Sequence, residues 1–448
     1  MIDHVIILAG GKGSRMSSSK SKPVHDFAGK PLIRWAYDLA KQCKPKFIHV
    51  VHGQNNQIEF APLIPDATIR WVCQKKPKGT ADALMCALDG IDKGQFLVIY
   101  ADMPLVNVSD IQSMLNLQGE LKLLSVRHDN PYGYGRLIRD DHDNPSAIIE
   151  EVDATNEQKK IQEVFTGILS GSVEQVKNWI QSLDNKNKQK EYLLTDIVAK
   201  AYKGEHSTYS HCSYNSVAFS GINSMAELVK LQRIYYEERA YAFLNKGVKI
   251  CDPARFECQG EVDIGYDTEV RPNVSLTGPC SIGSNCFIGE NAVLSHVQMG
   301  DHASIMANSV LDHTYLAAHS KVGPFAYCRN GTVIADYAEI GSFVETKQAY
   351  IGQRSKAKHL SYLGDVDIGK NCNIGAGVIV CNWDGKKKHK TVLGDHVFVG
   401  SDSQLIAPIH LEDYAFVAAG TCITKNVPKH NLSISRAKQL NKPRPSKI

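Results

Sequence analysis

Two stretches of the sequence carry residue types at spacings that chemistry could use. The first is Leu8-Ala9-Gly10-Gly11-Lys12-Gly13-Ser14-Arg15-Met16, which directly follows a short aliphatic run. Glycines let the backbone approach a phosphate, successive N–H groups form an anion-binding nest, and Lys12 and Arg15 add positive charge. The stretch lacks the third glycine of a dinucleotide fingerprint and the Gly-Lys-Ser/Thr ending of a Walker A loop. Alone, it fits either a phosphate loop or an ordinary glycine turn.

The second stretch is Lys356-Ala357-Lys358-His359-Leu360-Ser361-Tyr362-Leu363-Gly364-Asp365. A free imidazole titrates near ~6.5, so a histidine is the natural general base at neutral pH. The alternative is a surface histidine, because the chain has 17 histidines. His359 is therefore a candidate base whose role depends on its surroundings.

The N-terminal elements that must position the first stretch alternate between strand and helix patterns. We expect strands at 4–8, 47–51, 69–72 and 96–100, and helices at 31–42 and 81–88. This alternation predicts a mostly parallel sheet covered by helices. Ligands of such sheets lie beyond the C-terminal ends of the strands, where the candidate motifs should meet.

The C-terminal part repeats a six-residue unit between Ile264 and Ile423. Examples are IGYDTE, VRPNVS, IGSNCF, IGKNCN and VGSDSQ, each opening with an aliphatic residue. A hexapeptide period predicts a parallel β-helix, in which each coil buries its apolar side chains only by stacking on its neighbours. Residues 380–391 break the pattern, which predicts a loop ejected on the functional face.

The length and composition indicate a soluble protein of two or three domains. We expect a first domain at 1–223, a helical linker at 224–247 and a β-helix domain with a C-terminal tail at 248–448. The net charge of +4 favours no nucleic-acid or membrane partner. No signal peptide or spanning segment is present, so we expect a cytoplasmic protein. The basic tail residues (Lys438, Lys442, Arg444 and Lys447) are typical of a solvated tail.

Cysteine spacing points to packing. The twelve cysteines form no Cys-x-x-Cys motif or zinc-ligand cluster. Cys280, Cys286 and Cys372 each take the fifth place of a hexapeptide, where a small apolar group must pack. We expect buried, inert thiols at these places.

Further motifs follow the glycine-rich stretch in a fixed order. They are Lys22 in SKSKPV, Gln74 and Gly79-Thr80-Ala81 in VCQKKPKGTADA, Asp102 in IYADMPL, Gly135 in GYGR, Glu150 in IIEEVDAT, Thr166-Gly167-Ile168, and Asn223 in SGIN. Their order resembles that of the sugar-1-phosphate nucleotidyltransferases. With the C-terminal repeats, the chain resembles the bifunctional N-acetylglucosamine-1-phosphate uridylyltransferase/glucosamine-1-phosphate acetyltransferases over nearly its whole length.

This resemblance implies a fold and a set of roles. The fold is a Rossmann-like α/β nucleotidyltransferase domain, a helical connector and a left-handed parallel β-helix. In the first domain Arg15 and Lys22 would act on the triphosphate of UTP, and Asp102 with Asn223 would hold Mg²⁺. The residues implied to bind UTP or the UDP-sugar are Leu8, Gly10, Gly11, Lys22, Gln74, Gly79, Thr80, Gly135, Glu150, Thr166 and Asn223.

For the β-helix the resemblance implies acetyl transfer from acetyl-CoA, with His359 as the base. Arg329, Lys347, Tyr362, Asn373 and Glu345 would bind glucosamine-1-phosphate. The acetyl-CoA positions would be Ala376, Asn382, Trp383, Ser401, Ala419 and Arg436. Members of the family form trimers, so we expect a homotrimer in which the ejected loop and Ser435-Arg436 reach an adjacent coil. The run 386–390 is either a solvated loop or lies near the anionic cofactor.

Several positions depart from the family pattern. Ser14 stands for Thr, Ala101 for Gly, and Trp383 for Tyr. Phe165 replaces an Asn that binds the sugar, and Phe offers no side-chain hydrogen bond. The main prediction is a two-step synthesis of UDP-N-acetylglucosamine.

Three alternatives are open. They are an acetyltransferase with a retargeted nucleotidyltransferase domain, another sugar nucleotidyltransferase whose β-helix serves assembly alone, and a binding solenoid without enzymatic activity.

Overall fold

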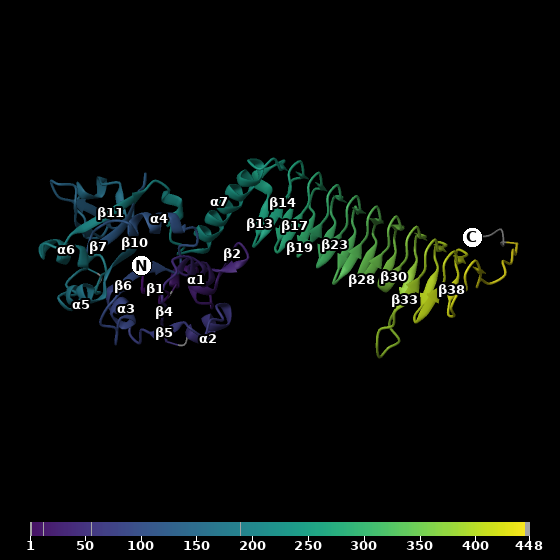
Figure 1. The fold of residues 1–448 in the computed structure, drawn as a ribbon, viewed down its shortest axis with the longest axis horizontal. Coiled ribbons are helices and arrows are strands. Elements are labelled where there is room, and N and C mark those ends of the chain that lie inside the picture. Colours follow the sequence, from purple (N-terminus) through teal and green to yellow (C-terminus); the bar gives the residue numbers. More distant parts are fainter. Residues whose placement is uncertain (1, 12, 55, 189, 444–448) are drawn as a thin grey trace. The chain divides into compact units, whose positions relative to one another are not determined.

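The computed structural model describes residues 2–11, 13–54, 56–188 and 190–443. It divides into two compact units, residues 1–232 and 233–448 (Figure 1). Lys12 of the glycine-rich stretch, and Arg444 and Lys447 of the tail, lie outside the described residues.

The first unit is built on a mixed sheet with the order β11-β7-β10-β6-β1-β4-β5, to which β8 and β9 add a hairpin. Its strands are β1 (His4–Leu8), β4 (Phe47–His52), β5 (Arg70–Cys73), β6 (Gln95–Tyr100), β7 (Leu121–Arg127), β8 (Arg136–Arg139), β9 (Pro145–Ile149), β10 (Glu163–Ser172) and β11 (Thr208–Ser213). A separate short hairpin joins β2 (Asp26–Phe27) and β3 (Lys30–Pro31).

The four strands expected from the sequence are parallel to one another, but the complete sheet is mixed. Strands β5, β4, β1 and β6 are parallel, and β11 is parallel to β7. Strand β10 runs antiparallel to both β6 and β7. The chain reaches β10 through the β8–β9 hairpin, and a parallel strand would need a long crossover, usually a helix.

The two helices predicted at 31–42 and 81–88 correspond to α1 and α3, and the described part of this unit adds four helices that were not predicted. The helices are α1 (Leu32–Gln42), α2 (Asn56–Phe60), α3 (Thr80–Ala87), α4 (Val108–Leu115), α5 (Val173–Gln181) and α6 (Asp196–Lys203). Their apolar faces pack in two clusters, one with Val5, Ile7 and α1 and one with Ile6, Leu8 and α3. Because successive strand residues point to opposite faces, these clusters lie on the two sides of β1.

Helix α7 (Met225–Leu244) begins with a capping box. The Ser224 hydroxyl accepts a hydrogen bond from the Glu227 N–H at 3.2 Å, and the Glu227 carboxylate accepts from the Ser224 N–H at 3.1 Å. At the other end Gly247 takes the left-handed conformation that closes a helix, with φ +84°. No helix among the described residues is both long and apolar enough to cross a bilayer.

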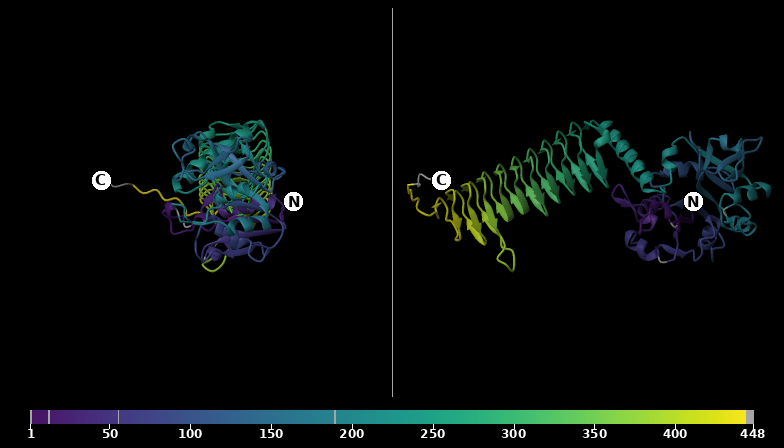
Figure 2. Two further views of the ribbon diagram at one scale, coloured as in Figure 1. Left: turned by 90° about the vertical axis from the view of Figure 1, so that its left-hand side faces the viewer. Right: turned by 180° about the vertical axis from the view of Figure 1, so that it is seen from behind.

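The second unit is a stack of parallel coils (Figures 1 and 2). One sheet contains β12 (Lys249–Ile250), β15 (Glu269–Val270), β18 (Phe287–Ile288), β21 (Ser304–Ile305), β24 (Lys321–Val322), β27 (Glu339–Ser342), β29 (Lys356–His359), β31 (Asn373–Ile374), β34 (Phe398–Val399), β37 (Phe416–Val417) and β39 (Leu432–Ser433).

The second sheet of this unit holds seventeen strands and bends around the stack. They are β13 (Glu257–Gln259), β14 (Val262–Ile264), β16 (Ser275–Thr277), β17 (Cys280–Ile282), β19 (Val293–Ser295), β20 (Gln298–Met299), β22 (Val310–Asp312), β23 (Thr314–Leu316), β25 (Tyr327–Arg329), β26 (Thr332–Ile334), β28 (Glu345–Ile351), β30 (Tyr362–Ile368), β32 (Ile379–Cys381), β33 (Thr391–Leu393), β35 (Gln404–Ile406), β36 (Ile409–Leu411) and β38 (Cys422–Ile423).

Buried aliphatic columns hold the coils together. Leu276, Leu294, Leu311 and Cys328 pair in successive coils, and each is fully buried. Residues in the left-handed conformation, such as His302, His319 and Tyr337, turn the corners. The hexapeptide prediction of a parallel β-helix is therefore confirmed.

Of two sequence expectations for this unit, the structure agrees with one and corrects the other. Cys280, Cys286 and Cys372 are free and buried, and burial raises the pKa of each thiol, as expected for inert packing groups. The ejected loop is shorter than predicted. Val380 stays in β32 because its side chain is buried in the coil, and Thr391 already belongs to β33.

Candidate functional site

The first candidate site is a cleft of about 470 Å³ at the C-terminal ends of β1 and β6. Leu8 is level with Val51 and Tyr100 in the sheet, and the Ala101 N–H donates to the Leu8 carbonyl at 3.1 Å. The glycine-rich loop and the segment after β6 therefore leave the sheet side by side. The cleft is lined by Leu8, Ala9, Gly10, Gly11, Lys22, Pro23, Gln74, Pro77, Gly79, Thr80, Ala83, Tyr100, Ala101, Asp102 and Glu191.

Four predicted polar residues meet at this strand edge. The Lys22 ammonium lies 2.5 Å from Asp102 Oδ2 and 3.1 Å from Asn223 Oδ1. Arg15 also donates to Asn223 Oδ1 at 3.1 Å. The structure thus gathers Arg15, Lys22, Asp102 and Asn223, although more than 200 residues separate the first from the last.

Asp102 and Asn223 are suited to hold a hard cation. Asp102 Oδ1 is buried and accepts no hydrogen bond from any described residue, so one carboxylate oxygen has no partner. Carboxylate and amide oxygens are ligands that Mg²⁺ accepts. Lys22 supplies the positive charge beside this pair in the structure.

One side of the cleft is shaped by a turn before α3. Gln74 is buried and donates through Nε2 to the Gly79 carbonyl and the Asp82 carboxylate. Gly79 has φ +117°, and a Cβ there would lie 2.3 Å from the Tyr192 carbonyl, so no other residue fits. The Thr80 hydroxyl accepts from the Leu194 N–H at 3.0 Å and is engaged within the fold.

Among the residues implied to bind UTP or the UDP-sugar, Gly135 and Glu150 are neighbours. A Cβ on Gly135 would lie 3.6 Å from Glu150 Oε2, and Thr195 donates to Glu150 Oε1 at 3.0 Å. Burial raises the pKa of Glu150. Thr166 is buried inside the sheet, where its hydroxyl donates to the Leu124 carbonyl at 2.7 Å and so anchors β10 to β7.

The sequence analysis did not identify Tyr100, which lines the cleft and also lies against Gly167. Its ring would contact any side chain at Gly167, with Cε2 only 2.6 Å from an added Cβ. Burial raises the pKa of Tyr100 strongly, with smaller contributions from the Asp102 and Glu150 carboxylates. The sequence feature that could have identified Tyr100 is its position at the end of an apolar strand, two residues before Asp102. Phe165 is buried in the same cluster of apolar side chains against which Tyr100 packs.

The second candidate site is a charged patch on the β-helix. Arg329 and Lys347 pair in successive coils, as do Glu345 and Tyr362. Arg329 donates to the Glu345 carboxylate at 2.5 Å, and this bond raises the pKa of the guanidinium. Asn382 joins the patch through a hydrogen bond to the Asp365 carboxylate at 2.5 Å.

Lys388 is a member of the patch to which the sequence analysis assigned no role of its own. It belongs to the segment between β32 and β33, which projects from the stack as a loop near the β33 label in Figure 1. A contact with Lys388 is the main cause that lowers the pKa of Lys347, and Arg329 adds to the effect. Three cations therefore converge on this face. The only signal in the sequence was the basic run at 386–390.

The loop that carries Lys388 is held together by hydrogen bonds among its own residues. Asp384 accepts from the N–H groups of Lys386 and Lys387 and from the His389 imidazole, which together lower the pKa of its carboxyl to about 2. Trp383 pairs with Lys388 through a β-bridge, and its indole is largely exposed.

His359 stands at the head of a column of small residues. Lys356 pairs in register with Asn373, Asn373 with Phe398, and Phe398 with Phe416. The positions three residues further along each of these strands are therefore in line as well. The side chains placed in line along this corner are His359, Ala376, Ser401 and Ala419. The column ends beside Arg436, whose Cδ lies 3.6 Å from a Cβ added at Gly420. No described residue hydrogen-bonds the exposed His359 imidazole.

One predicted residue lies apart from the patch. Asn373 is in β31 and pairs with Lys356 and Phe398, in the sheet that carries His359. Arg329 and Lys347 belong to the other sheet. Within one chain the expected sugar-phosphate residues are thus divided between two faces.

Together, a nucleotide-type cleft at strand ends and a parallel β-helix with a cationic patch define a two-unit transferase. Residues 5–166 match the MobA-like NTP transferase domain. Residues 279–313 and 390–425 match the hexapeptide repeat of succinyl-transferase.

The particular family follows from a full-length relative. The bifunctional protein GlmU of Marinobacter nauticus is 42% identical over 441 residues, covering 98% of this chain and 97% of the relative. The chain therefore belongs to the GlmU family of bifunctional proteins. A structure from Bacillus anthracis, described as a glucose-1-phosphate thymidylyltransferase in complex with sucrose, is 20% identical. It covers 51% of this chain and 94% of its own, with a TM-score of 0.42.

Proposed function

We propose that this protein makes UDP-N-acetylglucosamine in two steps. The β-helix unit transfers an acetyl group from acetyl-CoA to the amine of glucosamine-1-phosphate. The first unit then transfers a uridylyl group from UTP to N-acetylglucosamine-1-phosphate in a reaction that depends on Mg²⁺. Membership in the GlmU family supports both steps.

The observation that carries the first activity is the meeting of Arg15, Lys22, Asp102 and Asn223 at one strand edge. The sugar phosphate attacks the α-phosphorus of UTP and pyrophosphate leaves, so the site must hold several negative charges. Arg15 and Lys22 are suited to bind the triphosphate. The glycine-rich loop supplies backbone N–H groups without side chains in the way.

Asp102 and Asn223 are the residues that would hold Mg²⁺, which supplies positive charge to the phosphates. The unpartnered, buried Asp102 Oδ1 supports this assignment. Lys22 bridges Asp102 and Asn223 in the structure. We infer that Lys22 leaves this pair and turns to the triphosphate when the cation is present.

For acetyl transfer, we assign His359 the role of base. It takes a proton from the amine of glucosamine-1-phosphate as that amine attacks the thioester carbonyl. The carbon–sulfur bond then breaks, and CoA leaves as a thiolate that takes up a proton. Arg329, Lys347 and Lys388 bind the sugar phosphate by charge. The column Ala376, Ser401 and Ala419 gives acetyl-CoA a path free of large side chains from His359 towards Arg436.

We further propose a cytoplasmic homotrimer. All twelve cysteines are free, which suits a reducing compartment. The division of the expected sugar-phosphate residues between two faces supports a site completed by a neighbouring subunit.

Two single substitutions test the proposal. His359→Ala should lower acetyl transfer by at least about 10²-fold and leave uridylyl transfer unchanged, because a general base contributes about that much. Asp102→Ala should have the reverse effect. Acetyl-CoA consumption and pyrophosphate release measure the two activities separately. Near-normal acetylation by the His359 variant would refute its role as base, and loss of both activities would indicate misfolding.

A second candidate function rests on Phe165. This buried ring replaces the Asn with which the family binds the sugar, so the first unit would then act on a different sugar phosphate. Pyrophosphate release should be measured with N-acetylglucosamine-1-phosphate and, in parallel, with glucose-1-phosphate. Turnover of the N-acetylated sugar supports the main proposal. Turnover of glucose-1-phosphate alone, beside intact acetyl transfer, supports the retargeted alternative.

A further inference from the structure

Two adjacent coils of the β-helix carry histidine at the same corner. Ser295 pairs with Asp312 in register, and the His313 N–H donates to the Ser295 carbonyl at 2.9 Å. His296 and His313 both have positive φ, of 54° and 45°, as corner residues do. The backbone therefore places Ser295-His296 directly against Asp312-His313.

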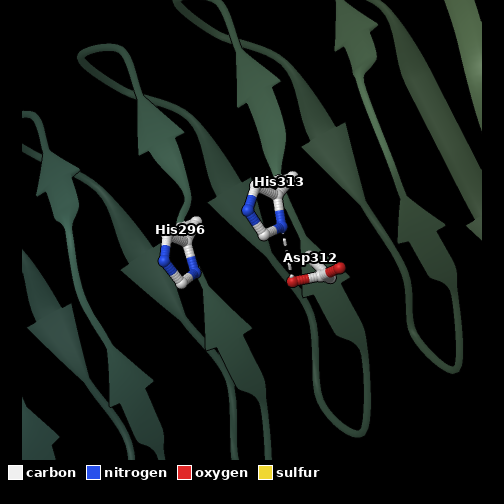
Figure 3. A group of neighbouring side chains, drawn as sticks. All are labelled: His296, Asp312 and His313. Atoms are coloured by element: carbon white, nitrogen blue, oxygen red, sulfur yellow. Dashed lines mark hydrogen bonds and ion pairs between the residues drawn. The ribbon is translucent and has the colours of Figure 1, made fainter. Parts of the chain in front are cut away.

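The side chains of these residues form a compact group (Figure 3). The two imidazole rings stack with centroids 4.3 Å apart. His313 Nδ1 lies 2.9 Å from Asp312 Oδ1, and Ser295 Oγ lies 2.9 Å from His296 Nδ1. One ligand atom from each of His296, Asp312 and His313 lies within 4.8 Å of the others.

Two imidazoles and a carboxylate are a ligand set that zinc-class divalent ions accept, with water completing the coordination. The Nε2 atoms of His296 and His313 bond to no described residue. The parallel rings must turn to face one ion, and the torsion about an imidazole's Cβ–Cγ bond has broad minima. The side chains are only partly buried, so both rings have room to turn.

The same β-helix contains a natural comparison. His302 and His319 also stack, with centroids 4.8 Å apart, at a different corner. The next ring in that stack belongs to Tyr337, whose phenol is not a zinc ligand comparable to an imidazole or a carboxylate. Among the described residues, the group of His296, Asp312 and His313 is the one cluster of three such side chains close enough to share an ion.

We propose that His296, Asp312 and His313 form a surface site for one divalent transition-metal ion of the zinc class. The site is separate from the proposed Mg²⁺ pair, which belongs to the first unit. It lies one coil before Arg329, since the Asn330 N–H donates to the Asp312 carbonyl at 3.1 Å. The proposal does not depend on either proposed reaction.

Calorimetric titration of the untagged full-length protein with Zn²⁺ tests the site. The double variant H296Q/H313Q should bind one fewer equivalent per chain, or bind that equivalent at least tenfold more weakly. The control H302Q/H319Q loses the same number of histidines and keeps every cysteine, so it should titrate like the parent. Equal titrations for both variants, whether unchanged or equally weakened, would overturn the proposal.

Two measurements guard against a folding artefact. The melting temperature of each variant without metal shows whether the β-helix is intact. Co²⁺ added to the single variant Asp312→Asn provides a spectroscopic readout, because its visible absorption reports the ligand set. We expect this variant to bind Co²⁺ more weakly than the parent and with an altered spectrum. A spectrum and affinity identical to those of the parent would exclude Asp312 from the site.

Discussion

The charges of individual side chains determine much of what each unit can bind. The charged patch of the β-helix, with Arg329, Lys347 and Lys388, is an example. Arg329, Lys347 and Lys388 outnumber the Glu345 and Asp365 carboxylates beside them, and the close approach of Lys388 lowers the pKa of Lys347. Such a cluster favours an anion that neutralises it. The proposed ligand, a sugar phosphate, carries the required charge.

We therefore predict that Lys388→Gln raises the KM for glucosamine-1-phosphate about tenfold, since a hydrogen bond between charged groups contributes on this order. It should leave kcat nearly unchanged. The pKa of Lys347 should rise towards its ordinary value, making Lys347 less reactive to amine reagents at neutral pH. The neighbouring variant Lys387→Gln is the control. An unchanged KM for Lys388→Gln would remove this residue from the phosphate site.

A buried histidine pair makes the stability of the first unit depend on pH. His4 Nδ1 lies 3.1 Å from His49 Nε2, and both side chains are buried. Burial, with a contribution from His4, lowers the pKa of His49 to about 4. An unfolded imidazole titrates near ~6.5, so between these values the unfolded chain binds a proton that the folded chain excludes.

Stability should therefore fall as the pH drops from about 6.5 to about 4, by up to about 3 kcal/mol from this residue. The variant His49→Gln keeps a polar side chain without this titration and should flatten the pH dependence. Urea unfolding of the first unit at several pH values measures the effect. The same pH slope in variant and parent would contradict the assignment.

At the scale of elements, each strand of the β-helix is too short to be stable alone. Leu311 is fully buried between Leu294 and Cys328 of the neighbouring coils, whereas the adjacent Val310 is partly exposed. Burial in columns, rather than strand propensity, therefore holds the coils in register.

We predict that Leu311→Ala destabilises the β-helix by about 2–5 kcal/mol, the usual cost of a large-to-small change in a core. Val310→Ala, one residue away, should change the unfolding free energy by less than about 0.5 kcal/mol. Guanidinium unfolding followed by circular dichroism gives both values. Similar effects of the two substitutions would show that the column does not carry the stability.

At the scale of the whole molecule, one corner of the β-helix exposes an apolar ladder beside His359. Phe325 and Phe343 stack with centroids 5.3 Å apart, and Leu360 occupies the same corner one coil on. Phe343 and Leu360 are 60% and 61% exposed. Large apolar side chains in a row are typical of a surface covered by a partner. We propose that another copy of this chain covers it.

Phe343→Glu should convert the proposed trimer into monomers and abolish acetyl transfer while uridylyl transfer continues. Light scattering after size exclusion should give about three times 49.4 kDa for the parent. Tyr214→Glu changes an exposed aromatic residue of the first unit and should leave the trimer intact. A Phe343→Glu protein that keeps the parental mass would place the subunit interface elsewhere.

Local patterns in the sequence predicted a large part of the fold. The aliphatic run 4–8 coincides with β1, and the hexapeptide period predicted the β-helix. The helical linker expected at 224–247 contains α7, which starts directly after its cap Ser224 and ends shortly before Gly247. These features depend on residues close together in the chain, so periodicity and caps suffice to find them.

Other features depend on which distant residues become neighbours. The direction of β10 follows from the β8–β9 hairpin, which lies outside the expected strands. Thr166 fits a sugar-binding motif, yet its hydroxyl is bonded to Leu124 across the sheet. Tyr100 and Lys388 joined the candidate sites only once the strand ends and the projecting loop were positioned.

The sequence alone determined the family resemblance, the order of the two units and the residue types available for chemistry, because each of these depends only on local or repeating sequence patterns. Tertiary structure decided which of those residues meet. His296 and His313 are 17 residues apart, and nothing in their local sequence joins them. They became neighbours because one coil of the β-helix has that length, so the register of the coils brings their side chains together.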